Sequence, residues 1–298
     1  MPELPDIEVY LSALRRRVLG QRIEAYNLNS PFLLRTVEPP VSEIVGREVL
    51  SLRRIGKRIV LGLSDELFMV VHLMIAGRLH WRPAPAKPPG KTALFVLRFP
   101  EGVLFLTEAG RKKRASLHVV QGEQGLQAID PGGIDVLHAT FEEFSRQLTA
   151  ENHTLKRTLT DPRLFSGIGN AYSDEILHAA RLSPIAMSQR MSESDIRALY
   201  EAVRGTLTEW RDRLQREVGD AFPDKVTAFR PEMAVHGKYG QPCPVCQTSV
   251  QRIRYADNET NYCPRCQTGG RLLADRGLSR LLKKDWPRTI DEWESRMG

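Results

Sequence analysis

The sequence predicts an α+β protein of several domains, with an antiparallel β-sandwich first, a helical domain next and a zinc-binding hairpin near the end. Three observations support this order: short β-rich runs up to residue 120, helical periodicity from 141 to 218, and four cysteines that all follow residue 240. A chain of 298 residues is also long for one hydrophobic core. We expect four segments, namely residues 1–130, 131–235, 236–270 and a C-terminal extension over 271–298.

The first expected element is an amphipathic helix over residues 3–19. Ile7, Leu11, Leu14 and Val18 recur at spacings of four, three and four residues, which places them on one helical face. Such a face packs against a hydrophobic core. The N-terminus of the chain should therefore lie beside the core of the first domain.

Seven β-rich runs follow this helix, separated by turn signals, and their number and spacing predict an antiparallel sandwich or barrel. The runs cover residues 22–28, 49–54, 57–63, 67–74, 93–99, 103–107 and 115–120. The Pro-rich stretch 82–91 interrupts them and should be an exposed loop. Residues 130–133, with the sequence Asp-Pro-Gly-Gly, are the best candidate for a hinge between domains.

Beyond this hinge the hydrophobic period becomes helical. The expected helices cover residues 141–148, 155–160, 171–181 and 192–218. The last of them begins at a capping box formed by Ser192 and Asp195. Between two of the helices, Gly167-Ile168-Gly169-Asn170 could form a tight turn that offers backbone N–H groups to a phosphate. The tetrapeptide alone fits an ordinary helix connection better.

All four cysteines lie in two CxxC pairs, Cys243 with Cys246 and Cys263 with Cys266, and sixteen residues separate the pairs. Two such pairs on the strands of a hairpin bring four thiolates to one point, which suits tetrahedral Zn²⁺. Two disulfides or four unrelated thiols are the alternatives, and neither explains why no cysteine occurs elsewhere. We therefore expect one structural Zn²⁺ and a reducing compartment.

The composition favours a polyanionic partner. Lysine and arginine outnumber aspartate and glutamate by 43 to 36, and the isoelectric point is about 9.4. Such a balance suits nucleic acid, although many soluble proteins are merely basic. No apolar run approaches the length of a membrane span, and the N-terminus shows no charged-then-apolar leader. We expect a soluble, intracellular protein with no membrane partner.

Pro2 becomes chemically interesting once Met1 is removed, because it then presents a free secondary amine. Attack of this amine on C1′ of a deoxyribose gives a cationic iminium, an electron sink for C–H cleavage and β-elimination of the 3′ phosphate. Glu3 and Asp6 place two carboxyl groups within a turn of the amine, where they could donate or accept protons. These residues also suit a simple helix start, and the hexapeptide alone favours that interpretation.

Three motifs occur in the order of one known family: Met-Pro-Glu-Leu-Pro-Asp at residues 1–6, Gly-Ile-Gly-Asn at 167–170, and the four-cysteine ribbon. The chain resembles the formamidopyrimidine-DNA glycosylase / endonuclease VIII family, as a divergent member, over nearly all of residues 1–267. Further matching segments are 55–57, 72–78, 155–161, 170–175 and 235–238. The resemblance implies a base-excision repair enzyme with a β-sandwich, a helix-two-turn-helix domain and a zinc finger, which bind duplex DNA in the cleft between the halves.

The resemblance also implies roles for individual residues. Pro2 is the nucleophile, and Glu3 is the adjacent acid–base residue. Lys57 corresponds to the hairpin lysine that reaches the phosphate and sugar at the lesion. Asn170 corresponds to the asparagine that holds the backbone beside the flipped nucleotide, with Lys156 as a supporting phosphate contact. Phosphate contacts on both sides of the lesion suit a base that must leave the stack before its glycosidic bond is attacked.

The chain departs from the family pattern at two of the expected site positions. Asp6 stands where the formamidopyrimidine branch usually has glutamate, so its catalytic carboxyl has a shorter reach. Asn258 stands where the finger arginine that meets the phosphates is expected. Four arginines on or near the same hairpin could replace it: Arg252, Arg254, Arg265 and Arg271. We expect Arg265 or Arg271 to do so.

The residues expected to fill the vacated base stack also differ. The family places a methionine there, followed by an arginine and a phenylalanine from a later loop. This chain offers Ile75 or Met74 for the first role and Arg111 for the second, with no phenylalanine after the arginine. Residues 269–298 extend past the usual end, and their leucines and Trp286 suggest a helical tail that packs on the ribbon rather than on a partner.

We therefore predict a bifunctional DNA glycosylase and AP lyase that removes damaged, oxidised bases and nicks the abasic site by β- or β,δ-elimination. One alternative is a lesion- or abasic-site-binding zinc-finger protein with lyase activity only or with no catalysis. Another is an RNA- or chromatin-binding zinc protein, which leaves the N-terminal hexapeptide unexplained. The expected partner is double-stranded DNA with damaged bases or abasic sites, bound by a monomer in the bacterial cytoplasm at the nucleoid.

Overall fold

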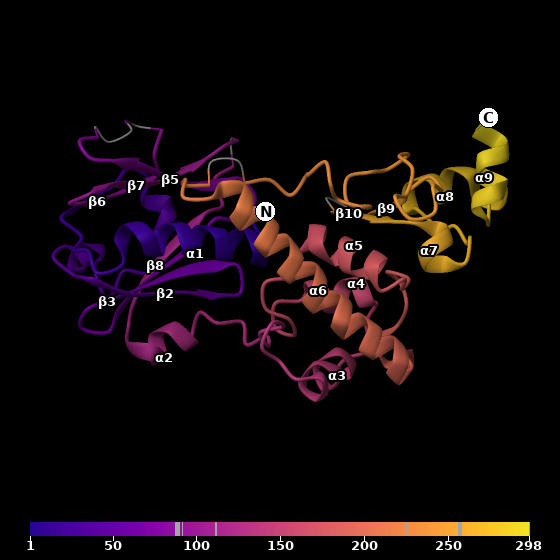
Figure 1. Ribbon diagram of the computed structural model, residues 1–298, viewed down its shortest axis with the longest axis horizontal. Coiled ribbons are helices and arrows are strands. Elements are labelled where there is room, and N and C mark those ends of the chain that lie inside the picture. Colours follow the sequence, from indigo (N-terminus) through magenta and orange to yellow (C-terminus); the bar gives the residue numbers. More distant parts are fainter. Residues whose placement is uncertain (87–89, 91, 111, 224–225, 256–257, 298) are drawn as a thin grey trace. The chain divides into compact units, whose positions relative to one another are not determined.

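The chain folds as two structural units, each described here by itself (Figure 1). The computed structural model describes residues 1–86, 90, 92–110, 112–223, 226–255 and 258–297. The first unit contains residues 1–132 and 210–228, and the second contains residues 133–209 and 229–298. The helical segment and the cysteine-bearing segment thus belong to one unit.

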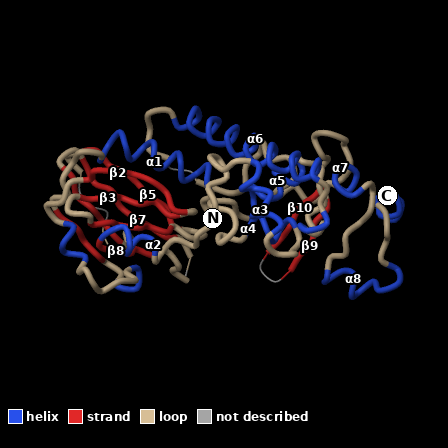
Figure 2. The backbone as a smooth tube through the Cα atoms, turned by 90° about the horizontal axis from the view of Figure 1, so that it is seen from below, coloured by secondary structure: helices blue, strands red, loops and turns tan. Residues whose placement is uncertain are grey.

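The first unit is built on two four-stranded antiparallel sheets (Figure 2). One sheet has the order β1-β6-β7-β5, with β1 (Ala25–Leu28), β5 (Gly77–Pro83), β6 (Phe95–Phe99) and β7 (Gly102–Glu108). The other has the order β2-β3-β4-β8, with β2 (Val49–Ile55), β3 (Arg58–Leu63), β4 (Leu67–His72) and β8 (Ser116–Gln121). The antiparallel sandwich expected from the sequence is confirmed, although β5 was not among the expected strands.

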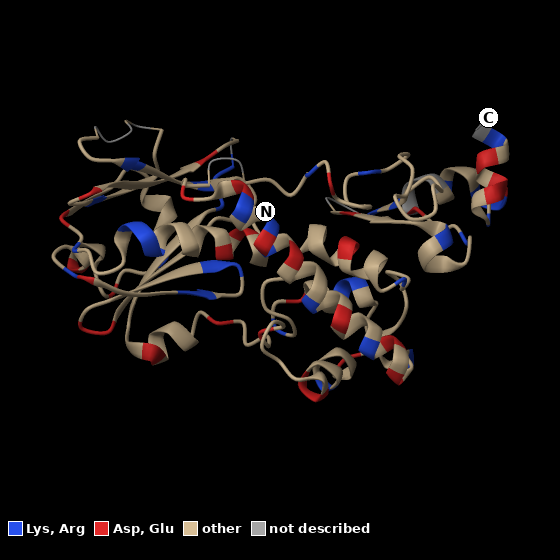
Figure 3. Ribbon diagram, viewed as in Figure 1, with Lys and Arg blue, Asp and Glu red and all other residues tan. Residues whose placement is uncertain are grey.

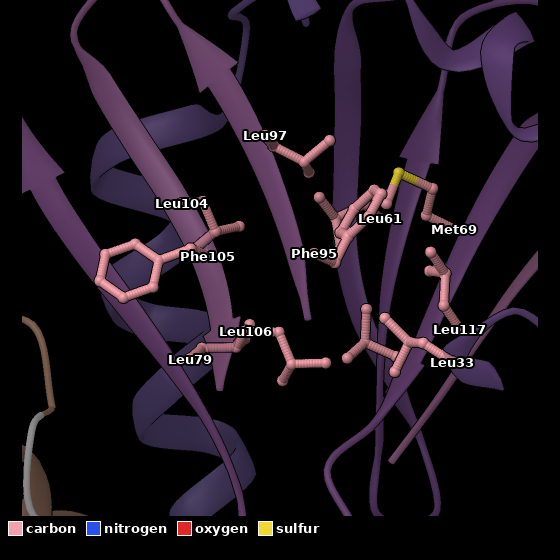
Figure 4. Close-up of a pocket in the computed structure, with 11 residues that line it drawn as sticks. Leu33, Leu61, Met69, Leu79, Phe95, Leu97, Leu104, Phe105, Leu106 and Leu117 are labelled. Carbon is pink, nitrogen blue, oxygen red and sulfur yellow. The ribbon is translucent and has the colours of Figure 1, made fainter. Parts of the chain in front are cut away.

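Side chains from both sheets meet in a shared core (Figure 4). Leu61, Met69 and Leu117 come from one sheet, while Phe95 and Leu106 come from the other. A cavity of about 20 Å³ remains between them, and its lining is entirely apolar. A space of that size can hold at most one water and offers it no polar partner, so this gap belongs to the core and is not a ligand site.

Strand β4 is apolar from Leu67 to Val71 because both of its faces are covered. Met69 and Val71 enter the sandwich core, whereas Phe68 and Val70 point the other way. On that second face they meet Leu126 of the short helix α2 (Gly122–Gln127). A strand buried on both sides loses the alternation of apolar and polar residues that marks a half-exposed strand.

Helix α1 (Leu4–Val18) packs on the sandwich through the face expected from the sequence. Ile7, Leu11, Leu14 and Val18 are all buried in the sandwich core. Acidic side chains lie in the first turn of the helix and basic ones in the last, as its dipole favours (Figure 3). The core packing fixes the start of α1, and with it the N-terminus of the chain.

The second unit begins with helices that support a small hairpin. The helices are α3 (Phe141–Thr149), α4 (Leu155–Thr160), α5 (Asn170–Ala179) and α6 (Glu193–Val218). The part of α6 from residue 210 onward belongs to the first unit. The hairpin consists of β9 (Gln251–Tyr255) and β10 (Asn258–Tyr262), followed by α7 (Pro264–Thr268). Helix α5 contacts both β10 and α7. The hairpin and the helices therefore pack as one body.

The C-terminal extension packs on the hairpin, and it contains α8 (Arg276–Leu282) and α9 (Ile290–Met297). The Tyr262 hydroxyl accepts a hydrogen bond from the Leu273 amide at 2.8 Å. The buried Asp275 carboxylate accepts one from the Arg254 amide of β9 at 2.7 Å. These bonds make the extension a structural part of the second unit.

Candidate functional site

The start of α1 gathers two buried carboxyl groups at the N-terminus of the chain. Glu3 is the N-cap residue, and its backbone amide donates a hydrogen bond to the Asp6 carboxylate at 3.0 Å. Both side chains are only 2% exposed. The shorter carboxyl of Asp6 is thus engaged in capping the helix, and Glu3 is held in a fixed place beside the terminus.

The terminal amine of the chain belongs to Met1 and lies in a partly buried, highly charged environment. Burial is the main cause that lowers its pKa, and the positive charges of Arg78 and Lys57 act in the same direction. The carboxylates of Glu3 and Asp6 oppose that shift. Glu3, Asp6 and Lys57, three of the sequence-predicted site residues, thus act on the N-terminus, where the neighbouring Pro2 is buried. Arg78 was not predicted as a site residue, although it closes the matching segment 72–78.

Lys57 is positioned by the tight turn between β2 and β3. Gly56 precedes it with φ of 59°, a left-handed backbone that glycine adopts without strain. The neighbouring His72 of β4 has a pKa lowered to about 4, mainly by burial and then by the charges of Arg58 and Lys57. His72 is therefore neutral at physiological pH, which leaves Lys57 as a positive charge at this edge of the sheet.

Ile75 is presented to solvent by the loop between β4 and β5. Its side chain is 56% exposed, whereas the neighbouring Met74 is partly buried. The Gly77 amide closes the loop by donating to the Leu73 carbonyl at 2.9 Å. A Cβ on Gly77 would lie 2.2 Å from that oxygen, so only glycine fits there. Arg111, predicted to act with Ile75, lies outside the residues that the structure describes.

In the second unit, Asn170 is the first residue of α5. Gly169 precedes it in an extended conformation, and the Asn170 side-chain amide donates to the Glu259 carbonyl of β10 at 2.9 Å. The asparagine therefore links the helical segment to the hairpin. Its position at a helix N-terminus suits contact with an anion.

Lys156 of α4 holds Asn170 in place. Its ammonium donates to the Asn170 carbonyl at 2.6 Å and to Oδ1 of Asp174 at 2.5 Å. Asp174 is 1% exposed, and its other oxygen lies 2.8 Å from Nδ1 of His236. The predicted phosphate contact is thus already engaged in a buried network. Asp174 and His236 were not predicted as site residues, although both lie in matching segments.

Glu175 anchors the segment that leads into the hairpin. Its carboxylate accepts hydrogen bonds from the amides of Ala234, Val235 and His236 at 2.7, 2.9 and 2.9 Å. Burial raises the pKa of Glu175, while these amides oppose the rise. The Asp-Glu pair after Asn170 could have indicated this anchor, because adjacent buried acids need partners.

The four cysteines converge as a metal site requires. Their sulfur atoms all lie within 4.8 Å of one another, with Cys243 to Cys266 at 3.9 Å and Cys246 to Cys263 at 3.3 Å. A tetrahedron of thiolates around Zn²⁺ has sulfur atoms about 3.8 Å apart. The residues therefore fit one structural zinc ion, as the spacing predicted. Nε2 of His178 in α5 lies 3.3 Å from Cys243 Sγ and supports that ligand.

Replacing Cys263 with serine should release the metal, because Zn²⁺ would keep only three thiolates. Zinc content, measured with a chromogenic chelator after gel filtration, should fall from one ion per chain toward none, and the melting temperature should fall with it. Val245→Ala serves as the control, since Val245 is 60% exposed within the same finger. Full zinc retention in the Cys263 variant would contradict this prediction.

The finger arginines differ in their surroundings. The Arg265 guanidinium donates hydrogen bonds to Thr248 Oγ1 at 3.0 Å and to the Asp291 carboxylate of the extension at 2.9 Å. Arg271 lies beyond α7, where its backbone pairs with Thr289. Asn258 is exposed at the first position of β10. Arg254 of β9 lies in the adjacent register pair with 65% of its side chain exposed, and its guanidinium lies 3.5 Å from the Glu259 carboxylate. Among the four candidates, Arg254 is therefore placed next to Asn258.

Comparison with known proteins agrees with this architecture. Residues 1–114 match the formamidopyrimidine-DNA glycosylase N-terminal domain, residues 133–212 match the formamidopyrimidine-DNA glycosylase H2TH domain, and residues 240–269 match the zinc finger found in FPG and IleRS. The fold and these matches define a bifunctional glycosylase/AP lyase of the helix-two-turn-helix, zinc-finger class.

Full-length relatives extend the match to nearly the whole chain. Formamidopyrimidine-DNA glycosylases of Carboxydothermus hydrogenoformans and Thermus thermophilus are 31% and 32% identical, over 90% and 91% of this chain and 100% of each relative. An uncharacterized formamidopyrimidine-DNA glycosylase-like protein of Mycobacterium tuberculosis is 40% identical over 51% of this chain and 94% of its own length. The chain belongs to the formamidopyrimidine-DNA glycosylase family.

Solved structures show the same fold. The MutM (FPG) protein of Thermus thermophilus is 29% identical, with a TM-score of 0.74 over 89% of this chain and 98% of that one. A Lactococcus lactis FPG mutant, solved with DNA containing Fapy-dG, is 24% identical, with a TM-score of 0.77 over 90% of this chain and 100% of that one. Among the described residues, no helix has the length and hydropathy needed to cross a bilayer.

Proposed function

We propose that this protein removes oxidised bases from double-stranded DNA and cleaves the resulting abasic site through an N-terminal proline. The observation that carries the proposal is the position of the buried Pro2 beside the buried Glu3 and Asp6, at an N-terminus on which the charges of Lys57 and Arg78 also act. The names of its relatives, formamidopyrimidine-DNA glycosylases, support the same substrate class.

The reaction would begin at the nitrogen of Pro2, after removal of Met1. This nitrogen forms a bond to C1′ as the bond from C1′ to the damaged base breaks, and the base leaves with a proton. The sugar ring opens, and the amine is now an iminium. Loss of a C2′ proton then breaks the C3′–O bond and releases the 3′ phosphate. Glu3, fixed beside the terminus, would carry protons in these steps.

The remaining site residues would hold the DNA backbone. Lys57 would meet the phosphate near the sugar, and Ile75, with Arg111, would occupy the space left by the flipped base. In the second unit, Asn170 would meet a phosphate, with Lys156 setting its position. On the finger we now favour Arg254 over Arg265 and Arg271, since it lies beside Asn258.

Each segment expected from the sequence would have its own role. Residues 1–130 would supply the catalysis, 131–235 and 236–270 would bind DNA, and the extension 271–298 would brace the finger. A family of bacterial relatives supports a bacterial cytoplasmic protein that meets its substrate at the nucleoid.

Borohydride trapping on a duplex with one abasic site tests the proposal. The wild-type protein should form a covalent adduct of protein and DNA, and it should release the base from duplexes that carry an oxidised purine or a formamidopyrimidine. An adduct without base release would indicate a lyase only. Binding without an adduct would support the lesion-binding alternative and would rule out the proposed chemistry.

The rate of trapping should rise with pH and level off at a lower pH than for an exposed N-terminal proline. Burial lowers the pKa of the Met1 amine, and the buried Pro2 amine that replaces it should lose its proton early for the same reason. Reductive trapping of a peptide of the first six residues without Met1 gives the reference profile. A protein profile that follows the peptide would contradict the effect of burial.

A further inference from the structure

The second unit carries a groove that the proposed DNA chemistry does not use. It runs between the segment 183–191, before α6, and the beginning of the C-terminal extension. Two adjoining cavities of about 670 and 430 Å³ form it, and they share Ile185, Met187, Arg271 and Leu273. Volumes of this size are typical of sites that hold a ligand. Arg271 and Leu273 both follow residue 269, where the zinc-finger match ends.

The floor of the groove is apolar. Leu273 is 4% exposed and closes the base, while Ile185 is 43% exposed. Met187 and Ile253 of β9 complete this surface. An exposed isoleucine beside a flexible methionine favours a partner that buries an apolar side chain there.

The rim of the groove is basic. Arg157 lines one cavity, Arg190 lines the other, and Arg271 lines both. All three residues are exposed, and no carboxylate in the described part of the chain forms an ion pair with any of them. Some other arginines of this unit are paired, since Arg163 pairs with Asp161 and Arg265 with Asp291, and Arg157 acts on Asp161 only at longer range.

We propose that this groove binds an acidic peptide segment of a partner protein, with a bulky apolar side chain of that segment seated on Ile185 and Met187. The guanidinium groups of Arg157, Arg190 and Arg271 would each take a carboxylate, for which their planar pairs of donors are suited. A DNA backbone would also meet the arginines, but its phosphates and sugars would leave the apolar floor uncovered. The combination of rim and floor favours the peptide.

This interaction is separate from the glycosylase reaction, and its test requires no catalysis. The probe is a fluorescein-labelled peptide of four aspartates followed by isoleucine and phenylalanine, titrated with the full-length, zinc-loaded protein and followed by fluorescence polarisation. Saturable binding is expected. Two control peptides, one ending in serine and glycine and one with lysines in place of the aspartates, should bind at least about tenfold more weakly.

Variants assign the binding to the groove. Arg190→Glu and Ile185→Asp should each weaken the peptide at least about tenfold, because one reverses a rim charge and the other places a charge on the floor. Arg146→Glu is the matched control, since Arg146 is exposed on α3 and lines neither cavity. It should change the affinity less than about twofold. Circular dichroism and zinc content establish that each variant is folded.

Two outcomes would overturn the proposal. The first is no saturable binding of the acidic peptide by the wild-type protein, or equal loss in the Arg146 control. The second is binding of an undamaged DNA duplex that displaces the peptide and weakens with Arg190→Glu, which would make the groove part of the nucleic-acid surface. Neither outcome bears on borohydride trapping, so a failure here is distinguishable from a failure of the proposed enzymatic function.

Discussion

Pro2→Gly should reduce covalent trapping on an abasic-site duplex by at least about a hundredfold. Proline supplies a secondary amine, whose adduct with C1′ is an iminium that stays cationic without a proton. Glycine supplies a primary amine, and its imine must be protonated before it can draw electrons. The measurement is the rate of adduct formation in borohydride, with mass spectrometry of the protein to establish that Met1 has been removed.

Matched controls separate this effect from damage to the fold. Pro40→Gly changes an exposed proline of the same domain and should leave trapping unchanged. A charge-removing change in the finger, such as Arg254→Gln, should weaken DNA binding and flatten its salt dependence while the adduct still forms at saturating protein. Adduct formation by a protein that keeps Met1 would overturn the role of Pro2.

Lys156→Met should lower the free energy of unfolding by about 3 kcal/mol. The substitution removes the ammonium from Asp174, which is 1% exposed and would keep its hydrogen bond with His236. It also removes the donor to the Asn170 carbonyl. Asn170 should then shift from its position, and the affinity for DNA should fall because of that shift. Urea unfolding measures the first effect, and titration of a labelled duplex at several salt concentrations measures the second.

The exposed ion pair of Arg163 with Asp161 provides the control for this prediction. Arg163→Met breaks a pair on the same unit, but the arginine is exposed and solvent screens the pair, so stability should change much less than in Lys156→Met. If Lys156 contacts DNA phosphate directly, its removal should instead leave stability unchanged and reduce the salt dependence of binding by about one unit. That pattern would contradict the buried network as its main role.

Sequence patterns predicted those parts of the fold that repeat locally. The face of α1 followed from four apolar residues at helical spacing, and the zinc site followed from two CxxC pairs, because in both cases the signal lies within a few residues. Strand β5 was missed for the opposite reason. Within it only Gly77 and Leu79 are buried, so its apolar pattern is too short to mark a strand.

The site residues show where sequence stops being informative. The family resemblance predicts Lys156 as a supporting phosphate contact, and that role stays a prediction. A lysine on a helix carries no sign of its partner within the fold. Its ion pair with Asp174 depends on how α4 packs against α5, which no local pattern encodes. The same holds for Arg265, whose partner Asp291 lies in the extension. Partners distant along the chain became apparent only from the packed structure.

Helix α5 also ties the metal centre to the asparagine in a way that bears on chemical damage. His178 in its last turn contacts Cys243, while Asn170 at its first residue bonds the hairpin. Cys243 and Cys263 are buried, whereas Cys246 and Cys266 are partly exposed. Oxidants such as peroxide should therefore attack Cys246 or Cys266 first and expel the metal. Oxidising conditions, which also increase the number of damaged bases, would then disturb helix α5 and the position of Asn170 at its first residue.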